Sequence, residues 1–466
     1  MKNLRYALLL VVGAGLVATL ATMALAPRPA SGGGAAQHGP PVSPEIQAML
    51  DQVSPDRIQQ TVAKLVSFGT RHTLSSQTDP NRGIGAATAW VDQQFQQIAA
   101  TSDGRMTVEE QTFTQPPGPR DPDGVSVTNV IATLHGQQPE SANRIYVVSG
   151  HLDSRVTDVL NGTSDAPGAD DDGSGVAAVL ELARVMATQR FDATIKFVAF
   201  DGEEQGLFGS TFFANDAKAQ GLNIAGMFSN DIIGSSHGMN GIHDNKDLRV
   251  FAQGPPPQET PAEAAVRRTS GGENDSPPRE LARFVREQAQ RAVPNMNVWI
   301  IYRRDRYLRG TDDGPFLDNG YPGLRMTEPN EDYRHEHQDV RVENGVQFGD
   351  LPQFLDYDYI AHVAQINGAA LAALANGPAA PSGVTVEDAT LTVDTTLFWH
   401  PNTEPDLAGY EIVYRDTNAP YWQHTIKVGN VTSFTVKGIT KDNFLFGVRA
   451  VDRDGNESVV SFPTPQ

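Results

Sequence analysis

Two almost wholly apolar stretches, separated by a helical pattern, constrain the fold of this 466-residue chain more than any other feature. The stretches are NRIYVVSG, which ends at Gly150, and TIKFVAFDG, which spans Thr194–Gly202. Such continuous apolar runs are typical of strands that are buried on both faces. Between them, apolar residues recur three or four positions apart from Val176 to Ala183, so one face of a helix is buried. This alternation predicts an α/β fold, in which a mostly parallel sheet is covered by helices on both faces.

Residues that can bind a metal ion follow each predicted strand. Ligands of open α/β sheets lie beyond the carboxyl ends of the strands, so we expect these residues to converge. They are His151 and Asp153 after the first strand, Asp170, Asp171 and Asp172 in the loop beyond it, Glu203 and Glu204 after the second strand, Asp231 after the third, and His335 and His337 in a later loop. The chain contains no cysteine, which excludes thiolate sites. Histidine and carboxylate ligands suit zinc, cobalt or manganese.

Two other kinds of ligand site can be excluded for the aspartate triplet. If Gly173 were the invariant glycine of a calcium-binding EF-hand loop, Gly168 and Val179 would stand at the first and last ligand positions, where neither residue can bind calcium through its side chain. No Gly-Lys-Ser/Thr sequence follows the triplet, so it is not a nucleotide phosphate loop. The triplet is therefore interpreted as part of the site at the strand ends.

The motifs SGHLDSR, PGADDDGSGVAAVLE, AFDGEEQGLFGS, SNDIIG and HEHQD resemble those of the di-zinc aminopeptidase family, metallopeptidase family twenty-eight. The resemblance extends from about Thr61 to Leu374 and implies a zinc-exopeptidase fold of the phosphorylase/hydrolase-like type. It also implies two zinc ions per chain. By position in the motifs, His151 and Asp231 would hold one ion, Glu204 and His335 would hold the other, and Asp171 would bridge both.

The resemblance also suggests roles for two carboxylates that lie next to the expected metal ligands. Glu203 stands beside a metal ligand without being one, so it is predicted to be the general base. Asp153 is predicted to accept the other ring N–H of His151 and so to fix its tautomer.

Two assignments within the family pattern stay open in the sequence. His335 and His337 compete for the last ligand position, and the spacing to Asp339 favours His335. The family often has a tyrosine immediately before this histidine, stabilising the oxyanion, but here Arg334 occupies that place and Tyr333 precedes it.

The predicted function is that of a zinc-dependent exopeptidase, most simply an aminopeptidase that acts on peptides with free N-termini and an apolar first residue. A carboxypeptidase and a single-zinc glutaminyl cyclase on the same fold are alternatives within the superfamily. A third alternative is a catalytically inert binding or adhesion protein. The enzyme is favoured because all five expected ligands and the base Glu203 are present.

The N-terminal segment predicts export. Lys2 and Arg5 precede a mostly apolar run from Tyr6 to Ala26, which is the layout of a secretory signal or, because the run is long, of an uncleaved N-terminal anchor. Residues 27–42, rich in glycine and proline, are predicted to be a flexible linker. We therefore expect a periplasmic or extracellular protein whose contact with a membrane, if it has one, is through this segment alone. The net charge of −20 argues against nucleic acid as a partner.

A change of sequence pattern predicts a second domain. The predicted peptidase domain spans residues 43–377, and a proline-rich break then leads to short alternating strands over residues 381–466. This segment resembles a fibronectin type III domain, with Trp399 at the position of the core tryptophan and Phe444 in place of the corner tyrosine. It is predicted to be an independent accessory domain without catalytic residues.

Overall fold

The computed structural model describes residues 42–466. The predicted signal or anchor, residues 1–26, and all but the last residue of the predicted linker, residues 27–42, lie outside the described residues and stay predictions. Within residues 42–466, no helix is both long enough and apolar enough to cross a membrane.

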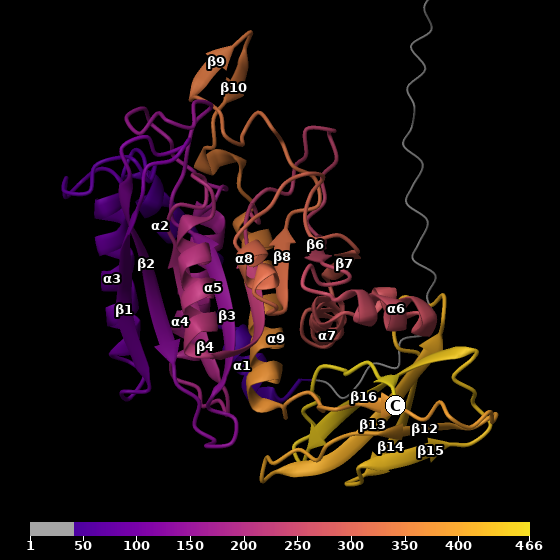
Figure 1. The fold of residues 1–466 in the computed structure, drawn as a ribbon. Coiled ribbons are helices and arrows are strands. Elements are labelled where there is room, and N and C mark those ends of the chain that lie inside the picture. The colour runs from indigo at the N-terminus through magenta and orange to yellow at the C-terminus, as the bar shows by residue number, and fades with distance from the viewer. Residues whose placement is uncertain (1–41) are drawn as a thin grey trace, which may run out of the picture. The chain divides into compact units, whose positions relative to one another are not determined.

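A mixed eight-stranded sheet, in the order β1-β2-β4-β3-β5-β8-β6-β7, organises the larger part of the fold (Figure 1). Its strands are β1 Met106–Gln115, β2 Val125–Leu134, β3 Arg144–His151, β4 Thr194–Phe200, β5 Asn223–Asn230, β6 Asp247–Ala252, β7 Asn297–Ile301 and β8 Gly323–Thr327. The neighbours β4, β3, β5 and β8 are parallel, whereas β2 and β6 run antiparallel to the strands at the borders of this group. The predicted parallel sheet is therefore confirmed at its centre, where the carboxyl ends of four strands meet at one edge.

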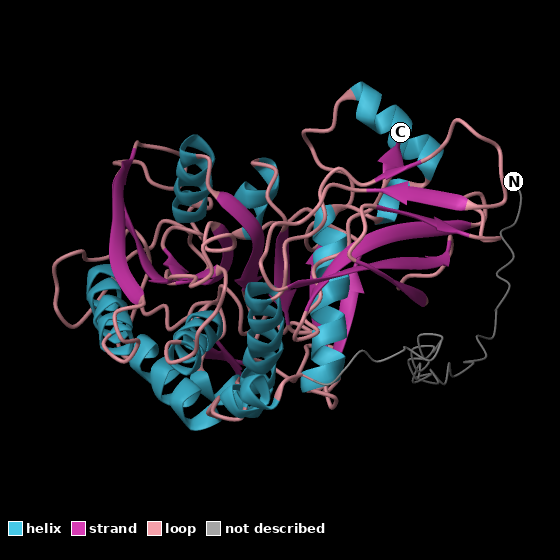
Figure 2. Ribbon diagram, turned by 90° about the horizontal axis from the view of Figure 1, so that it is seen from below, coloured by secondary structure: helices cyan, strands magenta, loops and turns pink. Residues whose placement is uncertain are grey.

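Helices cover both faces of this sheet (Figure 2). One face packs against α1 Pro44–Leu50, α2 Pro55–Val66, α3 Ile84–Ala99, α4 Gly173–Met186, α7 Pro277–Ala292 and α9 Tyr357–Asn376. The other face packs against α5 Phe208–Gln220 and α8 Asp313–Asp318. The helix α6 Pro261–Ser270 contributes no residue to these cores. Alternate residues of one strand serve the two cores, as Val147 and Val148 of β3 do, which explains why these strands are apolar throughout.

The C-terminal part forms two small β-sheets around a common core. Its strands are β11 Thr385–Val386, β12 Thr395–Phe398, β13 Leu407–Asp416, β14 His424–Gly429, β15 Ser433–Val436, β16 Phe444–Asp452 and β17 Thr464–Pro465. They form a four-stranded sheet, β15-β12-β11-β17, and a three-stranded sheet, β14-β13-β16. Trp399 is buried in the core between them, as expected, and its ring lies 5.3 Å from that of Tyr410. The relation to fibronectin type III domains stays a prediction.

Buried ionic contacts join this β-sandwich to the α/β part. The buried guanidinium of Arg415 lies 2.6 Å from Asp275 Oδ1, and Arg283 of α7 lies 3.1 Å from the same oxygen. Trp422 donates its indole N–H to Glu280 Oε2 at 2.9 Å. Removal of one partner of such an ion pair is costly, because the charge of the other partner is left buried without compensation. The two parts therefore share an interface, and the independence of the second domain stays a prediction.

We predict that breaking this interface destabilises the whole molecule. Arg415→Met should lower the free energy of unfolding by about 3–5 kcal/mol, because Asp275 loses a buried partner. Lys437→Met is the matched control, since it removes an exposed ion pair with Asp394 and should change stability little. Urea denaturation measures the stability of both variants, and equal stability of the two would contradict the interface.

A chain that ends at Gly377 should melt at a lower temperature than the full chain, because it lacks the contacts of the β-sandwich with α7 and Asp275.

Candidate metal centre and active site

The residues predicted to converge do so at the carboxyl ends of the four central strands. His151 is the last residue of β3, and Asp231 directly follows β5. Glu203 and Glu204 lie in the turn after β4, and a loop after β8 supplies His337. Because β4, β3, β5 and β8 are adjacent, these side chains come from four neighbouring positions along one edge of the sheet.

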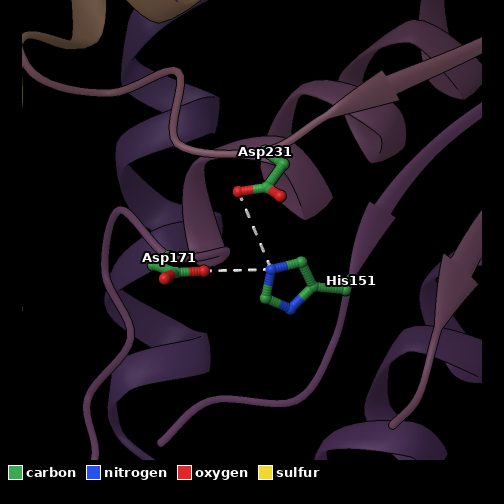
Figure 3. Close-up of side chains that lie close together, drawn as sticks. All are labelled: His151, Asp171 and Asp231. Atoms are coloured by element: carbon green, nitrogen blue, oxygen red, sulfur yellow. Dashed lines mark ion pairs between the residues drawn. The ribbon is translucent and has the colours of Figure 1, made fainter. Parts of the chain in front are cut away.

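One cluster contains His151, Asp171 and Asp231, all of them buried (Figure 3). His151 Nε2 lies 2.9 Å from Asp171 Oδ1 and 4.0 Å from Asp231 Oδ1. Two further groups hold the Asp231 carboxylate in place. The guanidinium of Arg325 lies 3.1 Å from Asp231 Oδ1, and the hydroxyl of Thr311 donates to Oδ2. One imidazole nitrogen and two carboxylates thus face one another, as three ligands of a zinc ion would.

A second cluster uses the other oxygen of Asp171. His337 Nε2 lies 2.7 Å from Asp171 Oδ2 and 2.9 Å from Glu204 Oε1. Glu336 is a further carboxylate within reach of Asp171 and His337. Its Oε1, however, lies 2.7 Å from the guanidinium of Arg309, so one of its oxygens already has a cationic partner. Asp171 therefore stands between two histidines, each accompanied by at least one more carboxylate, which is the geometry predicted for a bridging ligand.

The structure places His337, rather than the predicted ligand His335, beside Asp171 and Glu204, and which of the two binds a metal ion stays a prediction. The His335 ring stacks on Phe354 with ring centroids 3.5 Å apart, and its Nδ1 lies 3.6 Å from Asp332 Oδ2. The reason is the backbone: His337 has a φ of +53°, so the chain turns there and points the second imidazole at Asp171. The spacing of the HEHQD motif contains no information about this turn.

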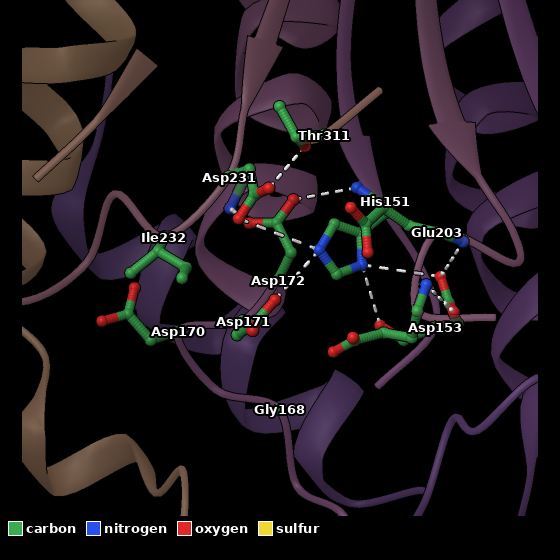
Figure 4. A network of polar contacts seen from close by, with 12 residues as sticks. His151, Asp153, Gly168, Asp170, Asp171, Asp172, Glu203, Asp231, Ile232 and Thr311 are labelled. Carbon is green, nitrogen blue, oxygen red and sulfur yellow. Dashed lines mark hydrogen bonds and ion pairs between the residues drawn. The ribbon is translucent and has the colours of Figure 1, made fainter. Parts of the chain in front are cut away.

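The three consecutive aspartates face three different environments (Figure 4). Asp172 accepts the N–H of His151 at 2.8 Å and, as the N-cap of α4, that of Gly175 at 2.9 Å. Asp170 accepts the N–H of Gly234 at 2.7 Å, and burial raises the pKa of Asp170 to about 7. Only Asp171 faces both histidines. The flanking carboxylates are thus accommodated by backbone N–H donors.

The loop that carries the triplet is held in place by Asp350, which the sequence analysis missed. Its carboxylate accepts the N–H groups of Asp170 and Asp171, both at 2.8 Å. The peptide bond between Asp171 and Asp172 is cis. Gly175 is required next to this loop, because a Cβ there would lie 2.3 Å from the carbonyl oxygen of Asn230. No sequence pattern identified Asp350, which lies far along the chain from the triplet.

The carboxylate of Asp153 is closer to the backbone of Glu203 and Glu204 than to the ring of His151. Its carboxylate accepts the backbone N–H of Glu203 at 3.1 Å and of Glu204 at 3.0 Å, and the hydroxyl of Thr73 at 3.0 Å. His151 Nδ1 lies 3.1 Å from the carbonyl oxygen of Asp153 and 3.5 Å from its carboxylate. The carbonyl is thus the nearer acceptor for the ring N–H, and the Asp153 carboxylate positions the turn that carries Glu203 and Glu204.

A cavity of about 540 Å³ lies against both clusters and is lined by Asp171, Glu203, Glu204, Asp231 and His337. Burial raises the pKa of the Glu203 carboxyl well above its usual range, and the nearby His151 opposes the shift. Glu203 therefore lies next to the two clusters and forms part of the cavity wall.

Comparison with known proteins agrees with this site. A sequence profile described as Peptidase family M28 matches residues 129–344, which include every residue of the two clusters. A protein of Pyrenophora teres f. teres named "Probable zinc metalloprotease" is 47% identical over 91% of this chain and 88% of its own length. A protein of the same name from Pyricularia oryzae is 49% identical over 90% of this chain and 84% of its own. The chain belongs to peptidase family M28.

Solved structures share the fold of this family member. LapB from Legionella pneumophila is similar with a TM-score of 0.50 and 19% identity, over 71% of this chain and 74% of that one. An aminopeptidase from Aneurinibacillus sp. strain AM-1 is similar with a TM-score of 0.50 and 16% identity, over 71% of this chain and 96% of that one. At these identities the likeness concerns the fold, and the chemistry has to be argued from the residues.

We predict that His337 and His335 respond differently to substitution. His337→Ala should weaken zinc binding by more than roughly 100-fold, because loss of a contact that only supports a ligand already costs about 10- to 100-fold. His335→Ala should leave the zinc content unchanged, because its ring stacks on Phe354. Metal analysis after dialysis against a weak chelator measures this. Loss of zinc from the His335 variant alone would restore the original assignment.

Proposed function

We propose that this chain is a zinc-dependent exopeptidase, most simply an aminopeptidase, with two zinc ions per chain. In this proposal His151 and Asp231 hold one ion, His337 and Glu204 hold the other, and Asp171 bridges them. The observation that carries the proposal is the position of Asp171, whose two oxygens lie 2.9 and 2.7 Å from two different histidines.

The donor atoms fit divalent cations. Glu204 Oε1 is buried and accepts no hydrogen bond from the described residues, although His337 Nε2 lies 2.9 Å away. A buried carboxylate oxygen without a donor is unfavourable unless a cation compensates it. Three carboxylates and two imidazoles are the hard and borderline ligands that zinc accepts. When bound, such ions polarise a peptide carbonyl and lower the pKa of a water towards about 7.

The proton transfers are assigned to Glu203. Its carboxylate takes a proton from the attacking water and delivers it to the nitrogen of the leaving amine. Hydrogen bonds from the N–H groups of Glu203 and Glu204 to Asp153 hold this turn in one conformation, so Asp153 acts as a positioning residue. A buried carboxyl whose pKa is raised is suited to hold the proton between the two steps.

The free α-amine of the substrate is proposed to bind beside the carboxylates of the cavity. Asp171, Glu203 and Asp231 belong to its wall, and an ammonium or amine group is complementary to their charge. This favours an aminopeptidase among the exopeptidases. The preference for an apolar first residue stays a prediction.

A carboxypeptidase is the second candidate, and one observation favours it. Four arginines, Arg120, Arg155, Arg306 and Arg309, line the same cavity as the clusters. Guanidinium groups bind carboxylates with two parallel hydrogen bonds, so they could receive the C-terminal carboxylate of a peptide.

The sequence of the N-terminal segment supports the further proposal that the enzyme is exported. Its substrates would then be peptides or proteins of the periplasm or the extracellular medium. The β-sandwich contributes no residue to the two clusters.

The first prediction of this proposal concerns Glu203. Glu203→Gln keeps the size of the side chain and removes its ability to accept a proton, so kcat should fall by roughly 10²- to 10⁴-fold. Zinc content should stay at two ions, because Glu203 is not a ligand. Steady-state kinetics together with metal analysis measure this. If the variant kept its activity, or lost its zinc, Glu203 would not be the base.

The second prediction concerns the substrate amine. Leucine anilide with a free amine should be hydrolysed, its amino-acetylated form should not, and removal of zinc with a chelator should abolish hydrolysis until zinc is returned. Equal hydrolysis of both anilides would exclude anchoring through the amine. Release of residues only from the C-terminus of longer peptides would establish the carboxypeptidase instead.

A further inference from the structure

The cavity beside the metal clusters is lined by groups of both charges. Its wall contains the carboxylates of Asp171, Glu203, Glu204 and Asp231 and the guanidinium groups of Arg120, Arg155, Arg306 and Arg309. A protein with a net charge of −20 has fewer basic than acidic residues, so four arginines around one cavity are a specific feature. Positive charge inside a cavity of an acidic protein attracts an anion.

Two of the four arginines already form ion pairs with carboxylates of the chain. Arg155 donates through Nε to Glu204 Oε2 at 2.8 Å, and its Nη2 lies 2.6 Å from His337 Nδ1. Through its bond to Glu204 it orients one proposed metal ligand. Arg306 is nearly buried and lies 3.0 Å from Glu331 and 3.5 Å from Glu336. These guanidinium groups are compensated by carboxylates of the chain.

The other two arginines retain free hydrogen-bond donors. Arg120 is exposed, makes no ion pair with the described residues, and uses only Nη1, which donates to the carbonyl oxygen of Glu204. Arg309 is 35% exposed and uses only Nη2, which lies 2.7 Å from Glu336 Oε1. Each guanidinium has five N–H donors in a planar fork, so most donors of both groups are available to a ligand.

These two arginines reach the cavity from opposite edges of the sheet. Arg120 lies in the loop after the edge strand β1, and Arg309 lies in the loop after the other edge strand, β7. Both loops meet at the cavity over the central strands. Two separate loops thus contribute one partly free arginine each to the same wall, which is the arrangement expected of a binding subsite.

We propose that Arg120 and Arg309 form a subsite for a carboxylate on the leaving-group side of the substrate. This inference rests on the proposed exopeptidase function. A peptide whose amine binds beside Asp171 and Asp231 would extend along the rest of the same wall, to which Arg120 and Arg309 belong. The carboxylate is either an acidic side chain of that residue or the C-terminal carboxylate of a dipeptide. The enzyme therefore prefers substrates with a negative charge one residue beyond the bond that it cleaves.

Three dipeptides with a free amine and the same scissile bond test the subsite and the source of the carboxylate. Leucyl-glutamine amide has no carboxylate, leucyl-glutamate α-amide has a side-chain carboxylate, and leucyl-glutamine has a C-terminal one. For the zinc-loaded enzyme, kcat/KM should be roughly 10- to 100-fold higher for at least one of the charged peptides than for the amide. The peptide with the higher kcat/KM shows whether the subsite binds a side-chain carboxylate or a C-terminal one.

Arg120→Gln and Arg309→Gln should each reduce this preference, and the preference should fall as salt is added. Arg303→Gln is the matched control: Arg303 lies in the same loop as Arg309 and is exposed, but it does not line the cavity. The Arg303→Gln variant should prefer the charged peptides as strongly as the wild type does. Equal kcat/KM for all three peptides, or an equal fall for all three in the arginine variants, would overturn the subsite.

A binding experiment separates this proposal from the proposed function. The same peptides are titrated calorimetrically into the zinc-loaded Glu203→Gln variant, which binds without turnover. Tighter binding of a charged peptide, lost in the Arg120→Gln and Arg309→Gln backgrounds, supports the subsite even if the wild type hydrolyses none of the three. In that case the exopeptidase assignment fails and the subsite stands. Equal affinity for all three peptides refutes the subsite independently of activity.

Discussion

The position of one carboxylate, that of Asp171, determines the rest of the site. Burial alone would raise the pKa of Asp171, but His337 and His151 outweigh it and hold that pKa well below its usual range. Asp350 holds the backbone of this loop by accepting the N–H groups of Asp170 and Asp171. Asp172 ties the same loop to the end of β3 and to the start of α4. The strand, loop and helix therefore form one support for the proposed bridging ligand.

The cavity beside Asp171 is lined by groups of opposite charge. Its carboxylates are suited to cations and to a substrate amine, and Arg155 balances part of their charge by pairing with Glu204. Arg120 and Arg309 add two further guanidinium groups to the same wall. A peptide that is positive at its amine and negative one residue further on matches both kinds of group, which connects the proposed chemistry to the proposed selectivity.

The sequence predicted the central strands and most of the site because the relevant residues follow strands directly. His151, Glu204 and Asp231 lie at or just beyond buried parallel strands, so their convergence follows from the direction of those strands. His337 could not be chosen over His335, since both lie in a long loop whose turn depends on tertiary contacts. Asp350 and Arg120 lie in loops without a periodic pattern. The contact between Arg415 and Asp275 was also missed, because a buried arginine resembles a surface arginine in sequence.

The central claim is that Asp171 bridges two zinc ions, and a crystal structure of the zinc-loaded protein with anomalous diffraction at the zinc edge tests it most directly. The account predicts two anomalous peaks about 3.5–4 Å apart, one next to His151 and Asp231, the other next to His337 and Glu204, with Asp171 between them. A single peak, or a second peak bound by His335 in place of His337, would contradict it.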